Sequence, residues 1–142
     1  MTQRTFEDPQ FELTFSYPDP TPGGQGVTLD GGPYRGGLRA HLRTVDRELY
    51  IEVVRFPLMA PDDEYAAHRA GLEKQFGAGS VSELRAAEFA RRQARAYTFA
   101  WPEGRREAIF FSTPGWSYRV IYNPASPLNA SVLEGARIVE FG

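Results

Sequence analysis

The residues best placed for chemistry are Glu64 and His68, a carboxylate and an imidazole four positions apart. On a helix this spacing puts both side chains on one face, the arrangement of two metal ligands in many zinc sites. The only other histidine, His41, belongs to a different predicted element. A metal site would need His41, Glu52 or Glu64 to meet His68 across the fold. We therefore expect an exposed, solvated helix pair and no bound metal.

Covalent catalysis has weak support in the sequence. The chain contains no cysteine, which excludes a thiol nucleophile, a thiolate metal site and a disulfide framework. Ser80 follows Gly-Ala-Gly and Ser112 precedes Thr-Pro-Gly, but neither lies in the Gly-x-Ser-x-Gly turn that exposes a nucleophilic serine. We predict no catalytic residue and no cofactor, and favour a domain that is not an enzyme.

Arginines lie among aromatic residues in the second half of the chain, a combination that can hold phosphates and stack bases. Arg91-Arg92 and Arg105-Arg106 fall at predicted turns or strand ends, on either side of Tyr97 and Trp101. The formal net charge is -2, whereas non-specific binding to nucleic acid is driven by a basic surface. We interpret these arginines as charges that protect strand ends from edge pairing, and nucleic acid is not an expected partner.

The predicted fold is organised around the stretch from Gln93 to Tyr122. Turns at Pro102-Glu103-Gly104 and Thr113-Pro114-Gly115 divide it into three strands. Aromatic residues recur with a period of two, which places them on one face of a strand. We expect an antiparallel meander with one aromatic-rich face. The aromatic residues of its first and third strands are Tyr97, Phe99, Trp101, Trp116, Tyr118 and Tyr122.

A Pro/Gly-rich segment, residues 18–37, is predicted to be a long loop. It contains four prolines and seven glycines, and loops of such length in compact domains are usually functional or mobile. Its Gly23-Gly24-Gln25-Gly26 lacks the lysine of a phosphate-binding P-loop. If the segment folds over the sheet, it forms a site with the next strand. The candidate polar residues of that site are Asp30, Tyr34, Arg35 and His41.

The remaining patterns predict the elements that position these residues. Short turns between consecutive strands imply an α+β fold, with an antiparallel sheet of about six to seven strands and helices packed on it. The first helix follows Pro61 and three acidic residues and ends at Gly77. Its expected buried stripe is Tyr65, Ala66, Leu72 and Phe76. Outside the meander, strands are predicted at 11–17, 38–45, 48–56 and 81–90, helices at 61–76 and 127–136, and a tail carries Ile138, Val139 and Phe141.

Length and composition limit the class of protein. With 142 residues, the chain is long enough for a single domain with one core. No segment approaches the ~20 apolar residues of a membrane span, and the first ten residues contain no apolar signal-peptide region. We expect a cytoplasmic protein that does not enter a membrane.

Three features together resemble a known family. An early strand ends in Phe15-Ser-Tyr-Pro18, a helix follows a strand pair in mid-chain, and a late Trp-Ser-Tyr-Arg-Val-Ile-Tyr-Asn strand precedes a Pro-capped helix. This order from Phe11 to the C-terminus is similar to the PsbP-like superfamily. That group includes the extrinsic PsbP protein of photosystem II, a Ran-binding nuclear import factor and bacterial proteins of unassigned role. The resemblance implies an α-β-α sandwich in a single domain. It carries over no functional residue, because members bind unlike partners.

The function predicted from sequence is that of a non-catalytic binding or accessory domain. A protein, a peptide or a small apolar ligand would dock on the aromatic sheet face, which a homodimer could also use. One alternative is a ligand-sensing domain or enzyme with its site under the 18–37 loop. A second is an assembly or secretion chaperone. The candidate binding residues are Tyr34, Arg35, His41, Tyr97, Trp101, Trp116 and Tyr118.

Overall fold

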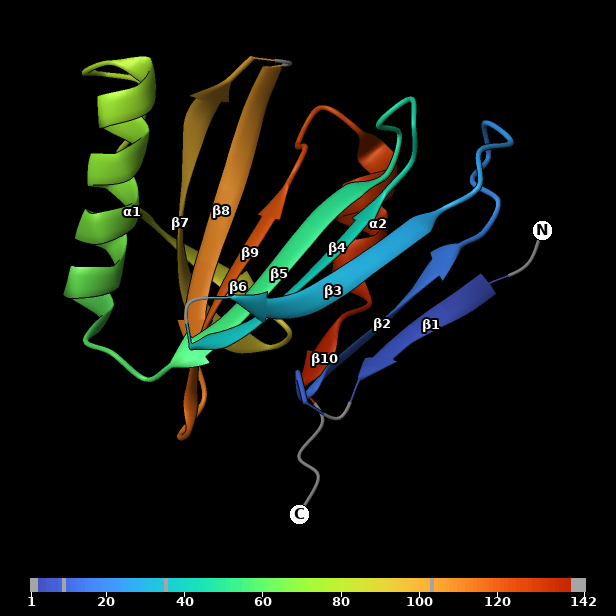
Figure 1. Cartoon of the computed structure of the whole chain (residues 1–142), viewed down its shortest axis with the longest axis horizontal. Helices are drawn as coiled ribbons and strands as arrows, with labels where there is room; N and C mark the ends of the chain where they lie inside the picture. Colours follow the sequence, from blue (N-terminus) through green and yellow to red (C-terminus); the bar gives the residue numbers. More distant parts are fainter. Residues whose placement is uncertain (1–2, 9, 35, 103, 139–142) are drawn as a thin grey trace.

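The computed structural model describes residues 3–8, 10–34, 36–102 and 104–138. Within them the chain forms an α+β fold with a seven-stranded antiparallel sheet, a three-stranded antiparallel sheet and two helices (Figure 1). The larger sheet has the strand order β3–β4–β5–β9–β8–β7–β6. Its strands are β3 (Thr28–Tyr34), β4 (Gly37–Arg43), β5 (Tyr50–Pro57), β6 (Arg85–Phe89), β7 (Arg92–Trp101), β8 (Gly104–Ser112) and β9 (Trp116–Tyr122).

The predicted three-stranded meander is confirmed as β7, β8 and β9, which pair in sequence order. The strand predicted at 81–90 is confirmed in its second half as β6, which forms a hairpin with β7. Ala90 and Arg91 make this hairpin turn with positive φ angles of 51° and 64°. Before β6, Val81 forms a single bridge to Phe99.

The prediction of one aromatic-rich face is wrong. Tyr97 lies opposite Ala108 on β8, and Ala108 lies opposite Ile121 on β9. Because residues that pair directly share a face, Ile121 rather than Tyr118 points to the same side as Tyr97. The aromatic residues of β7 and those of β9 therefore face opposite sides of the sheet.

The Pro/Gly-rich segment is not a continuous loop. Residues 28–34 form β3, which pairs with β4 along its whole length as an edge strand. Gly36 makes the turn to β4 with a φ of 82°, a conformation that glycine adopts without strain. At Gly37 the backbone of β5 passes so close that a Cβ atom would collide with the Arg55 carbonyl. These two glycines thus permit a hairpin rather than a loop folded over the sheet.

The smaller sheet contains β1 (Gln3–Asp8), β2 (Leu13–Pro18) and β10 (Arg137–Ile138), with β2 in the middle. The strand predicted at 11–17 corresponds to β2, whereas β1 was not predicted. The predicted C-terminal helix is confirmed as α2 (Pro127–Glu134). Ile138 belongs to β10, and Val139 and Phe141 lie outside the described residues.

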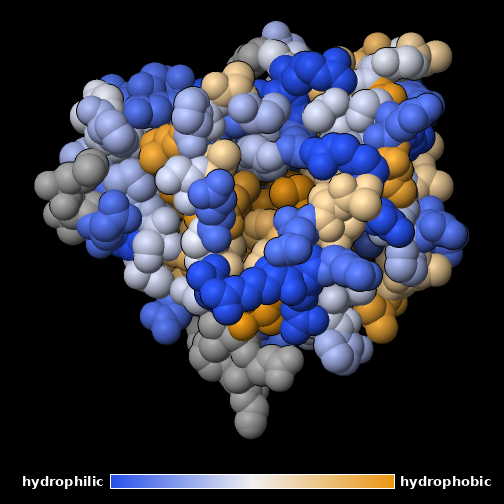
Figure 2. Space-filling view, turned by 180° about the vertical axis from the view of Figure 1, so that it is seen from behind, coloured by the Kyte–Doolittle hydropathy of each residue, from blue (hydrophilic) through white to orange (hydrophobic). Residues whose placement is uncertain are grey.

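The larger sheet separates two hydrophobic clusters. On one face the smaller sheet and α2 enclose a large core that includes Phe15, Ile51, Val120 and Leu133. On the other face α1 (Pro61–Phe76) covers a smaller cluster that contains Tyr97 and Phe110. Seen from behind the view of Figure 1, the surface is mainly hydrophilic, with hydrophobic groups in a recess near its middle (Figure 2).

Helix α1 has the predicted bounds but a different buried stripe. It starts at Pro61, and the amide of Gly77 caps its end by donating to the Glu73 carbonyl. Leu72 is buried as predicted, but Ala66 is exposed. The helix turns Glu64 and His68 toward the sheet, so the prediction of an exposed pair is wrong. Neither helix of the described chain has the length and apolar composition needed to cross a bilayer.

Tyr118 joins the two sheets and supplies a test of this architecture. Its buried hydroxyl donates a 2.9 Å hydrogen bond to the carbonyl of Phe11, in the turn between β1 and β2. Tyr118→Phe leaves that carbonyl without its donor, so the free energy of unfolding should fall by about 1–2 kcal/mol in urea denaturation. Tyr65→Phe, which alters a half-buried tyrosine on α1, is the control. Equal stability of Tyr118→Phe and wild type would contradict this role.

Candidate functional site

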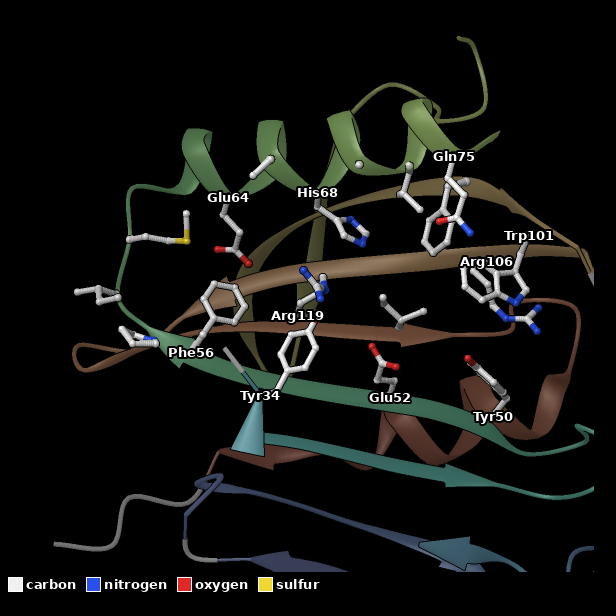
Figure 3. Close-up of a pocket in the computed structure, with 18 residues that line it drawn as sticks. Tyr34, Tyr50, Glu52, Phe56, Glu64, His68, Gln75, Trp101, Arg106 and Arg119 are labelled. Carbon is white, nitrogen blue, oxygen red and sulfur yellow. The ribbon is translucent and has the colours of Figure 1, made fainter. Parts of the chain in front are cut away.

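A cavity of about 710 Å³ lies between α1 and the larger sheet (Figure 3). One helical face lines it along its length, from Glu64 through His68 and Gly71 to Gln75. The sheet contributes residues from β5, β7, β8 and β9, and Tyr34 at the end of β3 completes the wall. The segment between β5 and α1 adds Leu58 and Met59 at one end, so apolar and polar side chains share the lining.

The cavity exists because α1 packs on one part of the sheet. Tyr65 contacts Phe110 edge-on with ring centroids 5.1 Å apart, and Phe76 contacts Trp101 at 5.6 Å. Arg69, on the same side of the helix, donates a hydrogen bond to the Ser82 carbonyl in the segment before β6. These contacts hold α1 over β7 and β8. The face of β9 and β5 beside the helix is left to line the cavity.

Glu64 brings a carboxyl group from the first turn of α1 into this space. Glu64 is only 6% exposed, and its Oε1 atom has no hydrogen-bond partner in the described chain. Burial raises the pKa of the Glu64 carboxyl to about 8, and the charge of Arg119 acts in the opposite direction. Glu64 is therefore mainly in its neutral acid form at pH 7, in which it can donate a hydrogen bond.

Arg119 points into the cavity from β9, the central strand of the larger sheet. Its neighbours across the sheet are Val54 on β5 and Phe110 on β8. Its Nε atom is buried without a hydrogen-bond partner, and no ion pair of Arg119 occurs among the described residues. Glu64 and Arg119 extend toward one another from the helix and from the sheet (Figure 3).

His68 lies one helical turn after Glu64 and is a neutral group. Its Nδ1 atom shares a 2.5 Å hydrogen bond with the Tyr97 hydroxyl, and the two rings stack with centroids 5.7 Å apart. Burial, aided by the nearby Arg119 charge, lowers the pKa of His68 to about 3. Burial also raises the pKa of Tyr97. The imidazole therefore stays uncharged at neutral pH and anchors the helix to β7.

The other end of the cavity combines an aromatic wall with a second guanidinium. Arg106, which is 1% exposed, lies over the Tyr50 ring at 4.5 Å from its centroid. Trp101 forms the wall beside them. Glu52 also lines the cavity, but its carboxylate binds the Arg39 side chain, with a closest N–O distance of 2.6 Å.

The structure brings together only some of the residues predicted from sequence. Tyr34 and Trp101 line the cavity, and Tyr97 lies beneath α1 in contact with His68. Trp116 and Tyr118 belong to the opposite face, where Tyr118 is fully buried in the large core. They do not form a common docking surface with Tyr97, because the register of β8 separates them.

His41 and Asp30 lie outside the cavity beneath α1. Together with Tyr34 they line a smaller pocket of about 270 Å³ on the face of β3 and β4. His41 contacts the Tyr50 ring edge-on at 4.7 Å, and burial lowers its pKa. Arg35, the remaining predicted binding residue, lies outside the described residues.

Of the polar residues of the cavity, Glu64 and His68 were predicted only as an exposed pair, and Arg119 was not predicted as a site residue. Glu64, His68 and Leu72 are spaced by four residues, which places them on one helical face with a buried leucine. Arg119 shares a strand face with Ser117 and Ile121, and that face is the less apolar one of β9. The helical spacing therefore directs Glu64 and His68 toward the core, whereas the strand pattern gives no such signal for Arg119.

No group of three or more potential metal-ligating side chains occurs among the residues that the structure describes. Glu52 and His68 line the same cavity, but they do not assemble such a group with His41. The cavity thus offers carboxyl, guanidinium and imidazole groups as hydrogen-bonding partners within mostly apolar walls.

The buried carboxyl makes stability depend on pH. The pKa of Glu64 rises from 4.5, its ordinary value, to about 8 in the folded chain. Between these two pH values the folded chain keeps the Glu64 proton, whereas the unfolded chain has released it. The free energy of unfolding should therefore fall as the pH rises through this range. Glu64→Gln removes this loss, and at pH 9 it should exceed wild type by roughly 2–5 kcal/mol in urea denaturation.

His68 supplies the control of opposite sign. The pKa of His68 is lowered from 6.5 to about 3 in the folded chain, so between these pH values only the unfolded chain is protonated at His68. The free energy of unfolding should therefore fall as the pH falls through this range. His68→Gln should flatten the acidic side of the profile and leave the alkaline side unchanged. If Glu64→Gln follows the wild-type profile between pH 5 and 9, the carboxyl is not buried as described.

Comparisons with known proteins give no relative from which a role could be taken: no family model matches the chain, and no curated protein is significantly similar to it.

Proposed function

We propose that this protein is a non-catalytic domain that binds a small molecule in the cavity between α1 and the larger sheet. The volume of about 710 Å³ lies within the ~300–1,000 Å³ that small-molecule sites occupy. Such sites combine apolar walls with a few inward-pointing polar groups, as this cavity does.

The observation that carries the proposal is the pair of buried polar atoms without protein partners, Glu64 Oε1 and Arg119 Nε. An unsatisfied buried polar group costs about 1–3 kcal/mol of stability, so proteins rarely retain one without a use. The side chains that carry these atoms line one cavity from different elements, which supports a ligand that hydrogen-bonds to them. The perturbed pKa of Glu64 adds support, because such groups concentrate at functional sites.

The apolar walls support a ligand with a hydrophobic body. Phe56, Leu58 and Met59 gather at one end, and Phe99 and Trp101 lie at the other. Leu58 is 54% exposed and Met59 is 38% exposed. Exposed large side chains beside a cavity provide apolar surface that a ligand covers.

The contacts of the two histidines favour a binding function over a catalytic one. His68 bonds the Tyr97 hydroxyl, and His41 contacts Arg43. Neither histidine bonds a serine or threonine hydroxyl within the described residues, so the pairing that activates a nucleophile is not assembled.

We also propose that the domain belongs to the PsbP-like superfamily as an α-β-α sandwich. The order of elements supports this, with an early strand, a strand pair before α1, a meander and a late helix α2 that follows Pro127. Since fold does not determine the ligand, this proposal is independent of the binding proposal.

Gly71 permits a direct test of ligand binding. It lines the cavity from the middle of α1, and a Cβ atom there would have no other atom within 4 Å. Gly71→Phe should fill the cavity at no cost to the helix, because glycine is a poor helix former. We expect the affinity for the uncharged dye N-phenyl-1-naphthylamine, measured by fluorescence titration, to fall at least about tenfold.

Ala70→Phe is the matched control, since Ala70 is exposed on the same helix and does not line the cavity. It should bind the dye as wild type does. In a Trp116→Phe background the remaining tryptophan is Trp101, so its fluorescence gives a second readout of dye binding. Equal dye affinity of the Gly71→Phe and Ala70→Phe variants, or no binding to wild type, would refute the proposed function.

A further inference from the structure

We propose that the ligand is an elongated monocarboxylic acid, whose carboxylate binds between the side chains of Arg119 and Glu64 and whose apolar body extends along α1 toward Trp101. This inference rests on the proposed function, because it assigns a ligand class to the same cavity.

Arg119 determines the sign of the charge on the ligand head group. Its guanidinium lies on the central strand, with Val54 and Phe110 as cross-strand neighbours and no ion pair in the described chain. A cation in apolar surroundings interacts more strongly with an anion than it would in water. The guanidinium fork also matches a carboxylate, which it can bind through two parallel N–H···O bonds.

Glu64 supplies a hydrogen-bond donor rather than a competing charge. The residue is 6% exposed, and burial raises the pKa of its carboxyl to about 8, so the acid form prevails at neutral pH. An acid hydroxyl can donate to the ligand carboxylate that Arg119 binds from the sheet side. A ligand ammonium would instead meet the guanidinium charge.

At the Glu64 end of the cavity the charges favour a single negative charge on the head group, because the second guanidinium, that of Arg106, lies at the other end over the Tyr50 ring. Glu52 is already bound by Arg39, and His68 is uncharged at neutral pH because its pKa is about 3. A phosphate monoester, with a charge near −2, would exceed what Arg119 compensates. The titratable or charged groups that face Glu64 or line the cavity with it come from every neighbouring element: Arg119 on β9, Tyr97 on β7, His68 and Tyr65 on α1, Glu52 and Tyr50 on β5, Arg106 on β8 and Tyr34 on β3.

The shape of the cavity sets the form of the ligand. Its helical wall runs from Glu64 to Gln75, a rise of ~16 Å along the helix axis. Beyond the polar groups near Glu64, this wall faces Phe99 and Trp101 across the cavity. A head group near the first turn of α1 therefore leaves a channel walled by Phe99 and Trp101 for a chain or ring, with Arg106 over the Tyr50 ring at its far end.

The test compares 6-phenylhexanoate with its primary amide and with 6-phenylhexylamine, using calorimetric titration of the intact protein at pH 7. These probes share one apolar body and differ in the head group. Wild type should bind the carboxylate at least about tenfold more tightly than the amide, as expected for a charge-assisted hydrogen bond, and the amine least tightly. Arg119→Met should lose this preference, whereas Arg119→Lys should keep part of it. Arg105→Met removes an exposed arginine as the control.

A pH series tests the part played by Glu64. Ionisation of Glu64 above pH 8 places a second negative charge beside the carboxylate probe, whose own charge is constant there. Wild-type affinity for 6-phenylhexanoate should fall about fivefold or more between pH 7 and 9. Glu64→Gln keeps a donor that does not ionise, so its affinity should stay constant over this range.

The outcomes separate this inference from the proposed function. Equal affinity for the carboxylate and the amide, or preference for the amine, overturns the carboxylate assignment while the cavity remains a binding site. Binding of N-phenyl-1-naphthylamine without binding of 6-phenylhexanoate also overturns the carboxylate assignment alone. If neither the dye nor any probe binds, both proposals fail. A carboxylate preference that survives in Arg119→Met also refutes the assigned head-group site.

Discussion

The site depends on a mismatch of width between one helix and a seven-stranded sheet. A helix with its side chains is about 10 Å wide, whereas seven strands at ~4.8 Å span roughly 30 Å. Aromatic contacts from Tyr65, His68 and Phe76 hold α1 over β7 and β8. On the opposite face, a second sheet and α2 together provide enough apolar surface to form the larger core. The α1 face therefore retains the cavity of about 710 Å³.

The cavity contains charged residues at positions where a packed protein core would carry apolar side chains. Arg119 and Arg106 occupy strand positions that point toward α1, where a packed core would carry aliphatic side chains. Glu64 lies on the helix face opposite them. Desolvation changes the chemistry of this glutamate from an anion to a donor acid. Under the proposed function, the buried groups that affect the free energy of unfolding are also the groups that bind the ligand.

Sequence patterns predicted the local elements better than their relationship in space. The end of α1 at Gly77 was located correctly, whereas the hairpin tip expected at Arg91-Arg92-Gln93 lies at Ala90-Arg91. The faces of Tyr97 and Tyr118 depend on the register across β8, which the period of a single strand does not determine. β3 was missed because its glycines and Pro33 resemble a loop, although an edge strand tolerates a proline. The Glu64–Arg119 site was missed because it joins residues from distant elements.

The attachment of α1 also determines how stability is distributed over the molecule. The seven strands of the larger sheet, from β3 at one edge to β6 at the other, are joined by continuous hydrogen-bond ladders. The large core packs on the face of this sheet that is opposite to α1. Helix α1 instead has no side-chain cap at Ala60, ends at Gly77 and rests on the smaller cluster. Amide hydrogens of α1 should therefore exchange with solvent through local opening, at a lower free energy than those of β5 and β9. For the proposed ligand, this local opening is a route into and out of the cavity that leaves the sheet folded.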